Sequence, residues 1–181
     1  IRRNREKPFF LYLAHAMPHK PLAASEAFYH KSEAGLYGDV LMELDHETGR
    51  LIKVLKELDL AKRTLVIFTS DNGPWYGGST GGLRGMKGRT WEGGLRVPLI
   101  AWWPQRIPAG HVSDEPAIIM DLFTTALTVA GIDIPKDRTI DGRDIMPLLT
   151  SDAKSPHEAL FSFRGPGLHS VTAGEWKLHL R

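Results

Sequence analysis

Residues 65–73 read Leu65-Val66-Ile67-Phe68-Thr69-Ser70-Asp71-Asn72-Gly73, and this stretch decides the fold class. Its first half is apolar and rich in β-branched and aromatic residues, which is typical of a buried strand. Asp71 and Asn72 then place a carboxylate and a carboxamide at the carboxyl end of that strand. In an open α/β sheet, ligands collect at this edge, and paired oxygen donors suit calcium or magnesium. The stretch therefore predicts an α/β protein with part of a metal site.

The segment that follows is dense in glycine and carries isolated cations. It runs from residue 77 to residue 98 and includes Arg84, Lys87, Arg89 and Arg96. Such a loop suits a place where backbone approaches a ligand closely, and its cations suit an anionic group. Two plainer alternatives stay open: the Asp-Asn-Gly sequence is also an ordinary turn, and the loop could be a solvated surface segment.

Apolar spacing predicts strands and helices in alternation. We expect helices at residues 38–58 and 120–130, the second ended by Gly131. We expect buried strands at residues 9–13, 65–69 and 97–102. This order indicates a mixed, mainly parallel sheet flanked by helices, with the site at its carboxyl edge.

The predicted secondary structure changes after about Pro135. Residues 141–149 are expected to form a turn into a short helix, and three short alternating stretches follow at 159–163, 170–172 and 177–180. We therefore divide the chain into a core domain part, residues 1–135, and the start of a small C-terminal antiparallel α+β subdomain, residues 136–181.

Composition narrows the function classes. The chain has 181 residues with 42% hydrophobic content, enough for a core. A net charge of +2 is too small to indicate nucleic-acid binding. No run of about 18 apolar residues predicts a transmembrane helix. The absence of cysteine excludes internal disulfides but leaves the compartment open.

Five blocks in order resemble the sulfatases of the alkaline-phosphatase superfamily, specifically the arylsulfatase A-like branch. Together they span nearly the whole chain. They are Pro8 to Leu13 leading to Pro18-His19-Lys20-Pro21; Tyr37 to Asp45; Thr64 to Gly73; Gly85-Met86-Lys87-Gly88 with Glu92 to Pro98; and Asp141 to Leu149.

The resemblance implies roles for four residues. Asp71 and Asn72 would hold calcium, or magnesium. His19 would contact the sulfate as a hydrogen-bond donor or acid, and Lys87 would neutralise charge on the ester and the leaving oxygen. Sulfate ester cleavage develops negative charge on that oxygen, which these groups can stabilise. The alternative for His19 is a capping or packing histidine in a proline-bounded turn.

The other half of such a site has no counterpart in this sequence. The family's nucleophile is a formylglycine made from a Cys/Ser-x-Pro-x-Arg motif, which belongs with two further aspartate ligands in an N-terminal half. The chain has no cysteine, and none of its serines begins that motif. The chain also opens at Ile1 close to a predicted core strand. We expect the C-terminal part of a longer polypeptide, inactive alone and with weak calcium affinity.

Other functions stay open. The same superfamily contains phosphodiesterases, phosphatases and phosphonate hydrolases, although the His19 and Lys87 blocks favour the one-metal sulfatase pattern. The chain could instead be a non-catalytic remnant that binds an anion or calcium, or a fragment that self-associates or pairs with the missing half. By resemblance, periplasmic, secreted and lysosomal locations are all compatible.

Three aromatic residues and one aspartate could each have either a functional or a structural role. Trp75, Tyr76 and Trp91 could stack on an aryl or sugar ring of the substrate, or could pack the glycine-rich loop against the domain. Asp121 could be catalytic, although a solvated or capping role at its predicted helix is more common.

Overall fold

The computed structural model describes residues 1–180, and the chain divides after Val66 into two compact units. Each unit is described by itself. The first contains η1 (Arg2–Asn4), α1 (Gly35–Glu57) and η2 (Ala61–Arg63). The second contains α2 (Glu92–Leu95), β2 (Leu99–Trp102), α3 (Asp121–Ala130), α4 (Met146–Thr150), β3 (Leu160–Arg164), β4 (Gly167–Ala173) and β5 (Trp176–His179). β1 (Val66–Thr69) begins at the last residue of the first unit.

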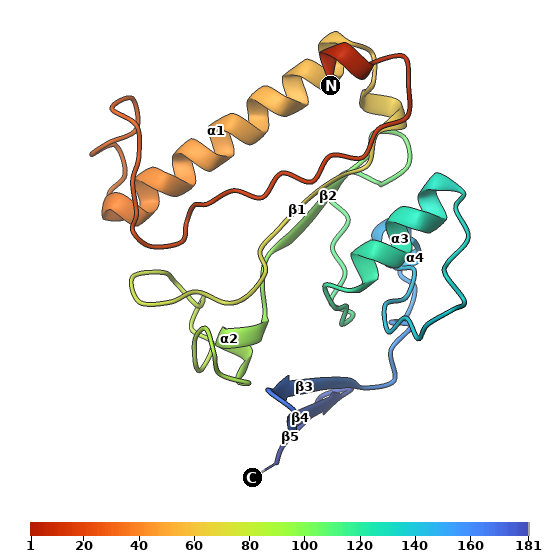
Figure 1. Ribbon diagram of the computed structural model, residues 1–181. Helices are drawn as coiled ribbons and strands as arrows, with labels where there is room; N and C mark the ends of the chain where they lie inside the picture. The colour runs from red at the N-terminus through yellow and green to blue at the C-terminus, as the bar shows by residue number, and fades with distance from the viewer. Residues whose placement is uncertain (181) are drawn as a thin grey trace. The chain divides into compact units, whose positions relative to one another are not determined.

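α1 confirms the helix predicted at 38–58 and is the long helix of Figure 1. Its apolar residues Val40 and Leu55 are each 1% exposed. The helix ends where Asp59 adopts a left-handed conformation, with φ of 55°. Leu60 then donates its backbone N–H to the carbonyl of Leu55 at 2.8 Å, and Leu60 itself is buried. This arrangement is a Schellman motif, in which a buried apolar contact accompanies the closing hydrogen bond.

A buried carboxylate connects α1 to the turn that precedes it. Asp39, which is 1% exposed, accepts backbone hydrogen bonds from His30 (2.9 Å), Lys31 (2.9 Å) and Ser32 (2.7 Å). A buried charge is tolerated only with such partners. Asp39 therefore fixes the entry of the chain into α1.

The predicted strand at residues 9–13 is the one element that does not form. Residues 8–16 are irregular, and Phe10 and Tyr12 are 82% and 81% exposed. A short continuous apolar run favours a buried strand, but a strand also needs a neighbouring backbone to pair with. Within residues 1–180, no such pairing is made to this segment.

The second unit confirms the remaining elements. β1 pairs with β2 in a two-stranded sheet, and β3, β4 and β5 form an antiparallel sheet in that order (Figure 1). Phe161 pairs with Val171, which pairs in turn with Leu178. α3 ends at Gly131, whose φ of 67° is left-handed, as predicted. The predicted domain boundary near residue 135 falls inside this unit and stays a prediction.

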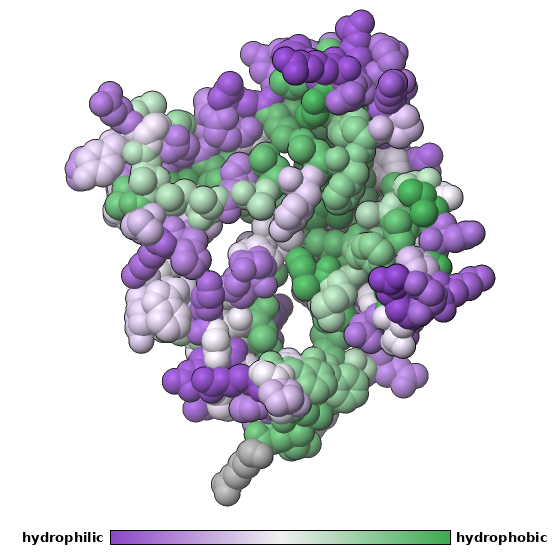
Figure 2. Space-filling view, viewed as in Figure 1, coloured by the Kyte–Doolittle hydropathy of each residue, from purple (hydrophilic) through white to green (hydrophobic). Residues whose placement is uncertain are grey.

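The antiparallel sheet has one strongly apolar, exposed face. Phe161, Phe163 and Leu178 are each about 60% exposed, at 59%, 61% and 61%, and Trp176 is 82% exposed. Figure 2 shows apolar surface at the lower end of the view, where Figure 1 shows this sheet. The opposite face carries Ser170, which is fully buried, so the interior of this subdomain lies on that side.

Candidate active site

The Asp71–Asn72 turn follows directly on β1. Thr69, the last residue of β1, donates from Oγ1 to the carbonyl of Pro98 at 2.9 Å, which ties the strand end to the segment before β2. Ser70 Oγ donates to the carbonyl of Asn72 at 3.2 Å. Asn72 Nδ2 donates to Asp71 Oδ2. Asp71 is exposed and Asn72 half-buried, so two adjacent side chains with oxygen donors lie at the end of a strand.

Gly73 brings this turn into close backbone contact with α2. Its backbone N–H donates to the carbonyl of Gly94 at 3.1 Å. A Cβ at Gly73 would collide with the carbonyl oxygen of Gly93. Glycine at 73 is therefore required by the close approach of two backbones. The two glycines of α2 make a different close approach, because a Cβ at Gly93 or Gly94 would collide with backbone carbonyl oxygens of residues 83–89.

The loop that carries Lys87 is bonded to the same turn. The backbone N–H of Lys87 donates to the carbonyl of Pro74 at 2.9 Å, two residues after Asn72. Gly85 and Gly88, with φ of 85° and 81°, let the chain bend on both sides of Lys87. The structure thus gathers Asp71, Asn72 and Lys87 in one loop cluster after β1, whose two parts are joined by main-chain hydrogen bonds.

Trp91 packs inside the loop, in agreement with the packing alternative. The guanidinium of Arg84 lies 3.8 Å from the centre of the Trp91 ring. The His179 ring lies 3.8 Å away, centre to centre, at an interplanar angle of 34°. A Cβ at Gly85 would come within 2.7 Å of Trp91 Cβ. These contacts leave Trp91 half-buried between the loop and β5.

β5 makes a second, ionic contact with the loop, which the sequence did not reveal. Lys177 Nζ lies 2.5 Å from Glu92 Oε1, and the Lys177 side chain is only 14% exposed. Arg96 Nε approaches the other oxygen of Glu92 at 3.9 Å. The alternation at residues 176–180 indicated that Lys177 and His179 lie on one face of a strand. Nothing in the sequence indicated which residues they contact.

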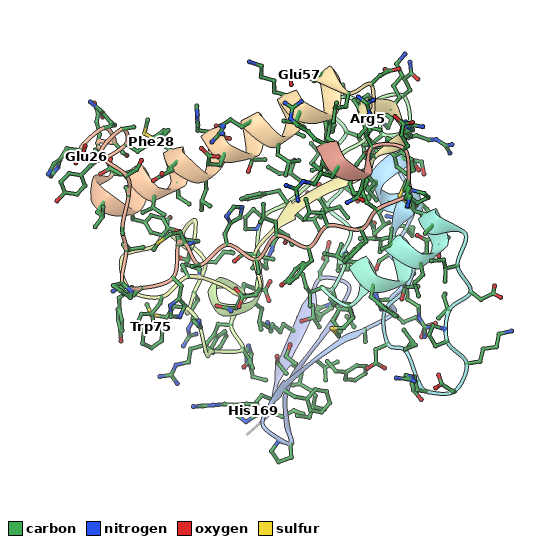
Figure 3. The ribbon with its side chains drawn as sticks, turned by 45° about the horizontal axis from the view of Figure 1, so that its top comes forward. Arg5, Glu26, Phe28, Glu57, Trp75 and His169 are labelled. Carbon is green, nitrogen blue, oxygen red and sulfur yellow. The ribbon has the colours of Figure 1, made fainter. Side chains whose placement is uncertain are left out.

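Trp75, which is labelled in Figure 3, and its neighbour Tyr76 are both exposed in the segment that follows Asp71–Asn72. Their rings meet edge to face at 4.7 Å between centres. Trp75 is 48% exposed and Tyr76 61% exposed. Of the three aromatic residues considered for ring binding, these two keep surface that a ligand can reach.

His19 lies in the first unit, in the predicted proline-bounded turn. Its Nδ1 is 2.8 Å from the carbonyl of Lys20, and its backbone N–H donates to Ala16 at 3.1 Å. The ring is exposed. Nδ1 is therefore engaged locally, and the catalytic role of His19 stays a prediction.

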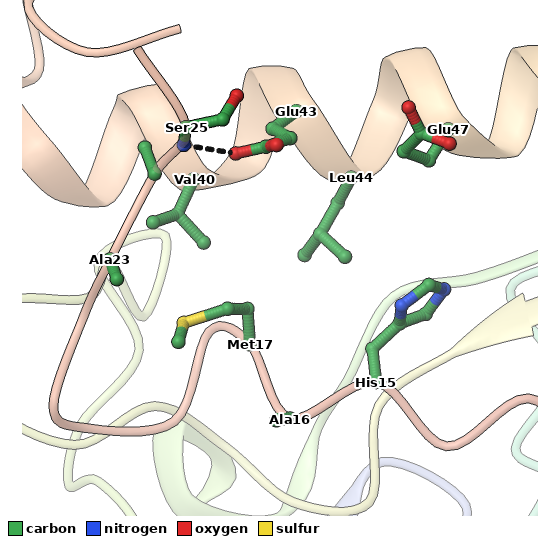
Figure 4. A pocket seen from close by; sticks show the side chains of 10 residues that line it. His15, Ala16, Met17, Ala23, Ser25, Val40, Glu43, Leu44 and Glu47 are labelled. Atoms are coloured by element: carbon green, nitrogen blue, oxygen red, sulfur yellow. Dashed lines mark hydrogen bonds between the residues drawn. The ribbon is translucent and has the colours of Figure 1, made fainter.

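His15 lines a cleft of about 420 Å³ within the first unit. Figure 4 shows His15 and Met17 on one side of the cleft and Val40 and Glu43 of α1 on the other. Glu43 accepts a hydrogen bond from the backbone of Ser25 at 2.9 Å. The cleft thus lies between α1 and the extended segment that carries the proline-bounded turn.

The donor atoms at the Asp71–Asn72 turn fit part of a hard-cation site. Asp71 Oδ1 and the Asn72 side-chain carbonyl accept no hydrogen bond from the described residues, and both are oxygen donors, as calcium prefers. Two residues are fewer than the 6–8 oxygens that calcium usually takes. Across residues 1–180, no group of three or more His, Asp and Glu could hold a metal.

Asp121 has a structural role, but the expected solvated or capping role is wrong, because its carboxylate is buried and bonds to backbone outside α3. It is fully buried and accepts backbone N–H bonds from Ile118 (2.8 Å) and Arg143 (2.7 Å). His157 Nε2 lies 2.8 Å from its Oδ1 and 3.0 Å from its Oδ2. Asp121 therefore fixes the start of α3 and anchors two later segments to it.

Comparison with known proteins decides the family. The family model described as Sulfatase matches residues 1–132. The chain belongs to the sulfatase family. Two similar sulfatases are N-acetylgalactosamine-6-sulfatase of Canis lupus familiaris, 44% identical over 96% of this chain, and human steryl-sulfatase, 44% identical over 94% of it. The chain spans 34% and 31% of their respective lengths.

The fold agrees with this membership of the sulfatases. A crystal structure of PsFucS1 sulfatase from Pseudoalteromonas sp. matches 89% of this chain with a TM-score of 0.82 and 33% identity, and the chain covers 34% of it. The predicted fold class, a partial alkaline-phosphatase-like α/β fold with a C-terminal antiparallel subdomain, is confirmed. None of the described helices has the length and apolar character needed to cross a membrane.

Proposed function

We propose that this chain supplies part of the active site of a sulfuric ester hydrolase. The observation that carries the proposal is the pair of main-chain hydrogen bonds, Gly73 to Gly94 and Lys87 to Pro74, at 3.1 and 2.9 Å. They join two sequence blocks of the sulfatase family into one cluster at the end of β1.

The residues of the cluster suit the chemistry of sulfate ester hydrolysis. Lys87 is a half-buried cation that can neutralise the sulfate and the charge that develops on the leaving oxygen. His19 would give a proton to that oxygen as the S–O bond breaks. Asp71 and Asn72 would provide two ligands of a calcium ion, which would supply Lewis-acid polarisation of the sulfate.

The nucleophile must come from residues outside positions 1–181. No cysteine is available, and no serine begins Ser-x-Pro-x-Arg, so formylglycine in the remaining part of a sulfatase is the expected nucleophile. We therefore propose that turnover needs a polypeptide of full sulfatase length that contains this chain.

The alcohol part of the substrate is proposed to be a ring. The two named relatives refer to an amino sugar and to a sterol. The exposed Trp75–Tyr76 pair, directly after the metal ligands, offers apolar surface against which such a ring can stack.

The test uses full-length polypeptide that contains this chain, assayed with an aryl sulfate and with an aryl phosphate diester. We expect hydrolysis of the sulfate, and Lys87→Ala should lower kcat/KM roughly 100-fold or more, as loss of a transition-state contact does. Lys136→Ala, which removes an exposed cation of the second unit, is the matched control and should act like the wild type. Faster hydrolysis of the diester, or normal kinetics in Lys87→Ala, would contradict the proposal.

A further inference from the structure

β5 touches the glycine-rich loop at two adjacent loop residues. His179 stacks on Trp91 at 3.8 Å between ring centres, and Lys177 pairs with Glu92 at 2.5 Å. Both contacts span more than 80 residues of sequence. They are the places where the described side chains of β5 meet the part of the loop that leads into α2.

The two β5 residues share one face of the strand. Lys177 and His179 are two positions apart, so their side chains point the same way. The alternate residues Trp176 and Leu178 are 82% and 61% exposed on the other face. The polar face of β5 is therefore the one that holds the loop.

The contacts at Trp91 reach the backbone around Lys87. Gly85 approaches the Trp91 side chain so closely that a Cβ there would lie 2.7 Å from Trp91 Cβ. The carbonyl of Arg84 accepts the N–H of Gly93 at 2.8 Å, just after the Trp91–Glu92 pair. The loop is thus closed on itself around Trp91, with Lys87 in the closed part.

We expect contacts from residues outside this closed loop to help keep Lys87 in place. Gly85 and Gly88 give the backbone on both sides of Lys87 unusual conformational freedom. A catalytic group contributes fully only when its supports keep it in the productive position. Lys177 and His179 are the side chains of β5 that supply such support from outside the loop.

We infer that Lys177 and His179 are positioning residues for Lys87: through Glu92 and Trp91 they hold the loop that presents the Lys87 ammonium to the sulfate group. The inference rests on the proposed role of Lys87. It assigns to the small C-terminal sheet a part in the chemistry of the site.

The kinetic test uses the full-length sulfatase polypeptide and an aryl sulfate. Lys177→Ala and His179→Ala should each lower kcat roughly 10-fold, less than Lys87→Ala, because a group displaced by about 1 Å loses up to about 100-fold. KM should change less than kcat. Leu178→Thr, on the exposed face of the same strand, is the matched control and should leave both constants unchanged.

Conservative variants separate positioning from direct contact with substrate. His179 Nε2 is buried and has no partner among residues 1–180, so His179→Phe keeps the ring stack and should restore kcat. Lys177→Arg keeps the ion pair and should do the same. Failure of both rescues, or an equal loss in Leu178→Thr, would overturn the inference.

Hydrogen exchange gives a readout that needs no turnover. In His179→Ala and Lys177→Ala, the amides of residues 84–94 should exchange faster than in the wild type, while those of α3 stay unchanged. Unchanged exchange in 84–94 would overturn the inference. Faster exchange in a full-length protein without sulfatase activity would support the hold on the loop and contradict only the proposed function.

Discussion

At Gly73, two stretches of backbone approach each other with no room for a side chain. A Cβ would meet the Gly93 carbonyl, and backbone atoms cannot move aside as a flexible side chain can. We expect Gly73→Ala to lower the free energy of unfolding by roughly 1–3 kcal/mol, the usual cost of overpacking. Urea denaturation measures this change.

The control for this substitution lies in the middle of α1. Gly49 has no atom within 4 Å of an added Cβ, so Gly49→Ala should raise the free energy of unfolding by about 0.5–1 kcal/mol through helix propensity. If Gly73→Ala were as well tolerated as Gly49→Ala, the close backbone contact between the Asp71–Asn72 turn and α2 would be contradicted.

Replacing Trp75 and replacing Trp91 are expected to change different kinetic constants. Trp75 is 48% exposed beside the turn, so Trp75→Ala should raise KM for a ring-bearing sulfate roughly 2- to 12-fold, the value of one aromatic contact, with little change in kcat. Trp91 supports the loop, so Trp91→Ala should lower kcat instead. Steady-state kinetics with aryl and carbohydrate sulfates distinguish the two, and matching profiles would contradict the assignment.

At the level of single elements, the entry into α1 depends on an ionised carboxylate. The backbone N–H of Ser32, joined by those of His30 and Lys31, holds the pKa of the Asp39 carboxyl below its ordinary value of 3.8, although burial opposes the shift. A lowered folded-state pKa contributes stability above pH 3.8, and this contribution is lost as the pH falls through the folded-state pKa.

Asp39→Asn should therefore lower the melting temperature at neutral pH, because the variant lacks the charge that these three N–H groups stabilise. The difference from the wild type should shrink as the pH drops below 3.8. Asp45→Asn, at an exposed position of the same helix, should show little difference at any pH. A difference between Asp39→Asn and the wild type that does not vary with pH would contradict the role given to the charge.

Helices and helix ends whose sequence pattern lies within a few neighbouring residues were predictable from sequence. The periodic apolar residues of α1 and α3, and the left-handed glycine after α3, act within a few residues of one another. The segment at residues 9–13 has an equally clear strand pattern, yet it forms no strand here. Strand formation depends on a partner backbone, which local sequence does not encode.

At the scale of the whole molecule, the site was predictable only as separate blocks. Resemblance singled out Asp71, Asn72, Lys87 and His19, and the structure joins the first three through main-chain bonds to Pro74 and Gly94. The stack of His179 on Trp91 was not predictable, because it depends on how β5 packs in three dimensions. His19 remains assigned by family resemblance.

Residues 1–181 expressed alone should neither hydrolyse an aryl sulfate nor remain monomeric. These residues contain no Cys/Ser-x-Pro-x-Arg motif, and large apolar side chains such as Phe10 and Tyr12 are more than 80% exposed, at 82% and 81%. Light scattering should show self-association, which the full-length polypeptide should not show. A monomeric fragment with protein-dependent turnover would contradict both expectations.

The central claim, that the Asp71–Asn72 turn and the Lys87 loop form one sulfate ester site, is tested most directly by a crystal structure. The sample would be full-length polypeptide containing this chain, with calcium and a non-hydrolysable sulfate ester analogue. We expect a cation bound by the Asp71 carboxylate and the Asn72 carbonyl oxygen, and the sulfate group within hydrogen-bond distance of Lys87 Nζ. A cation or sulfate bound away from these three side chains would contradict it.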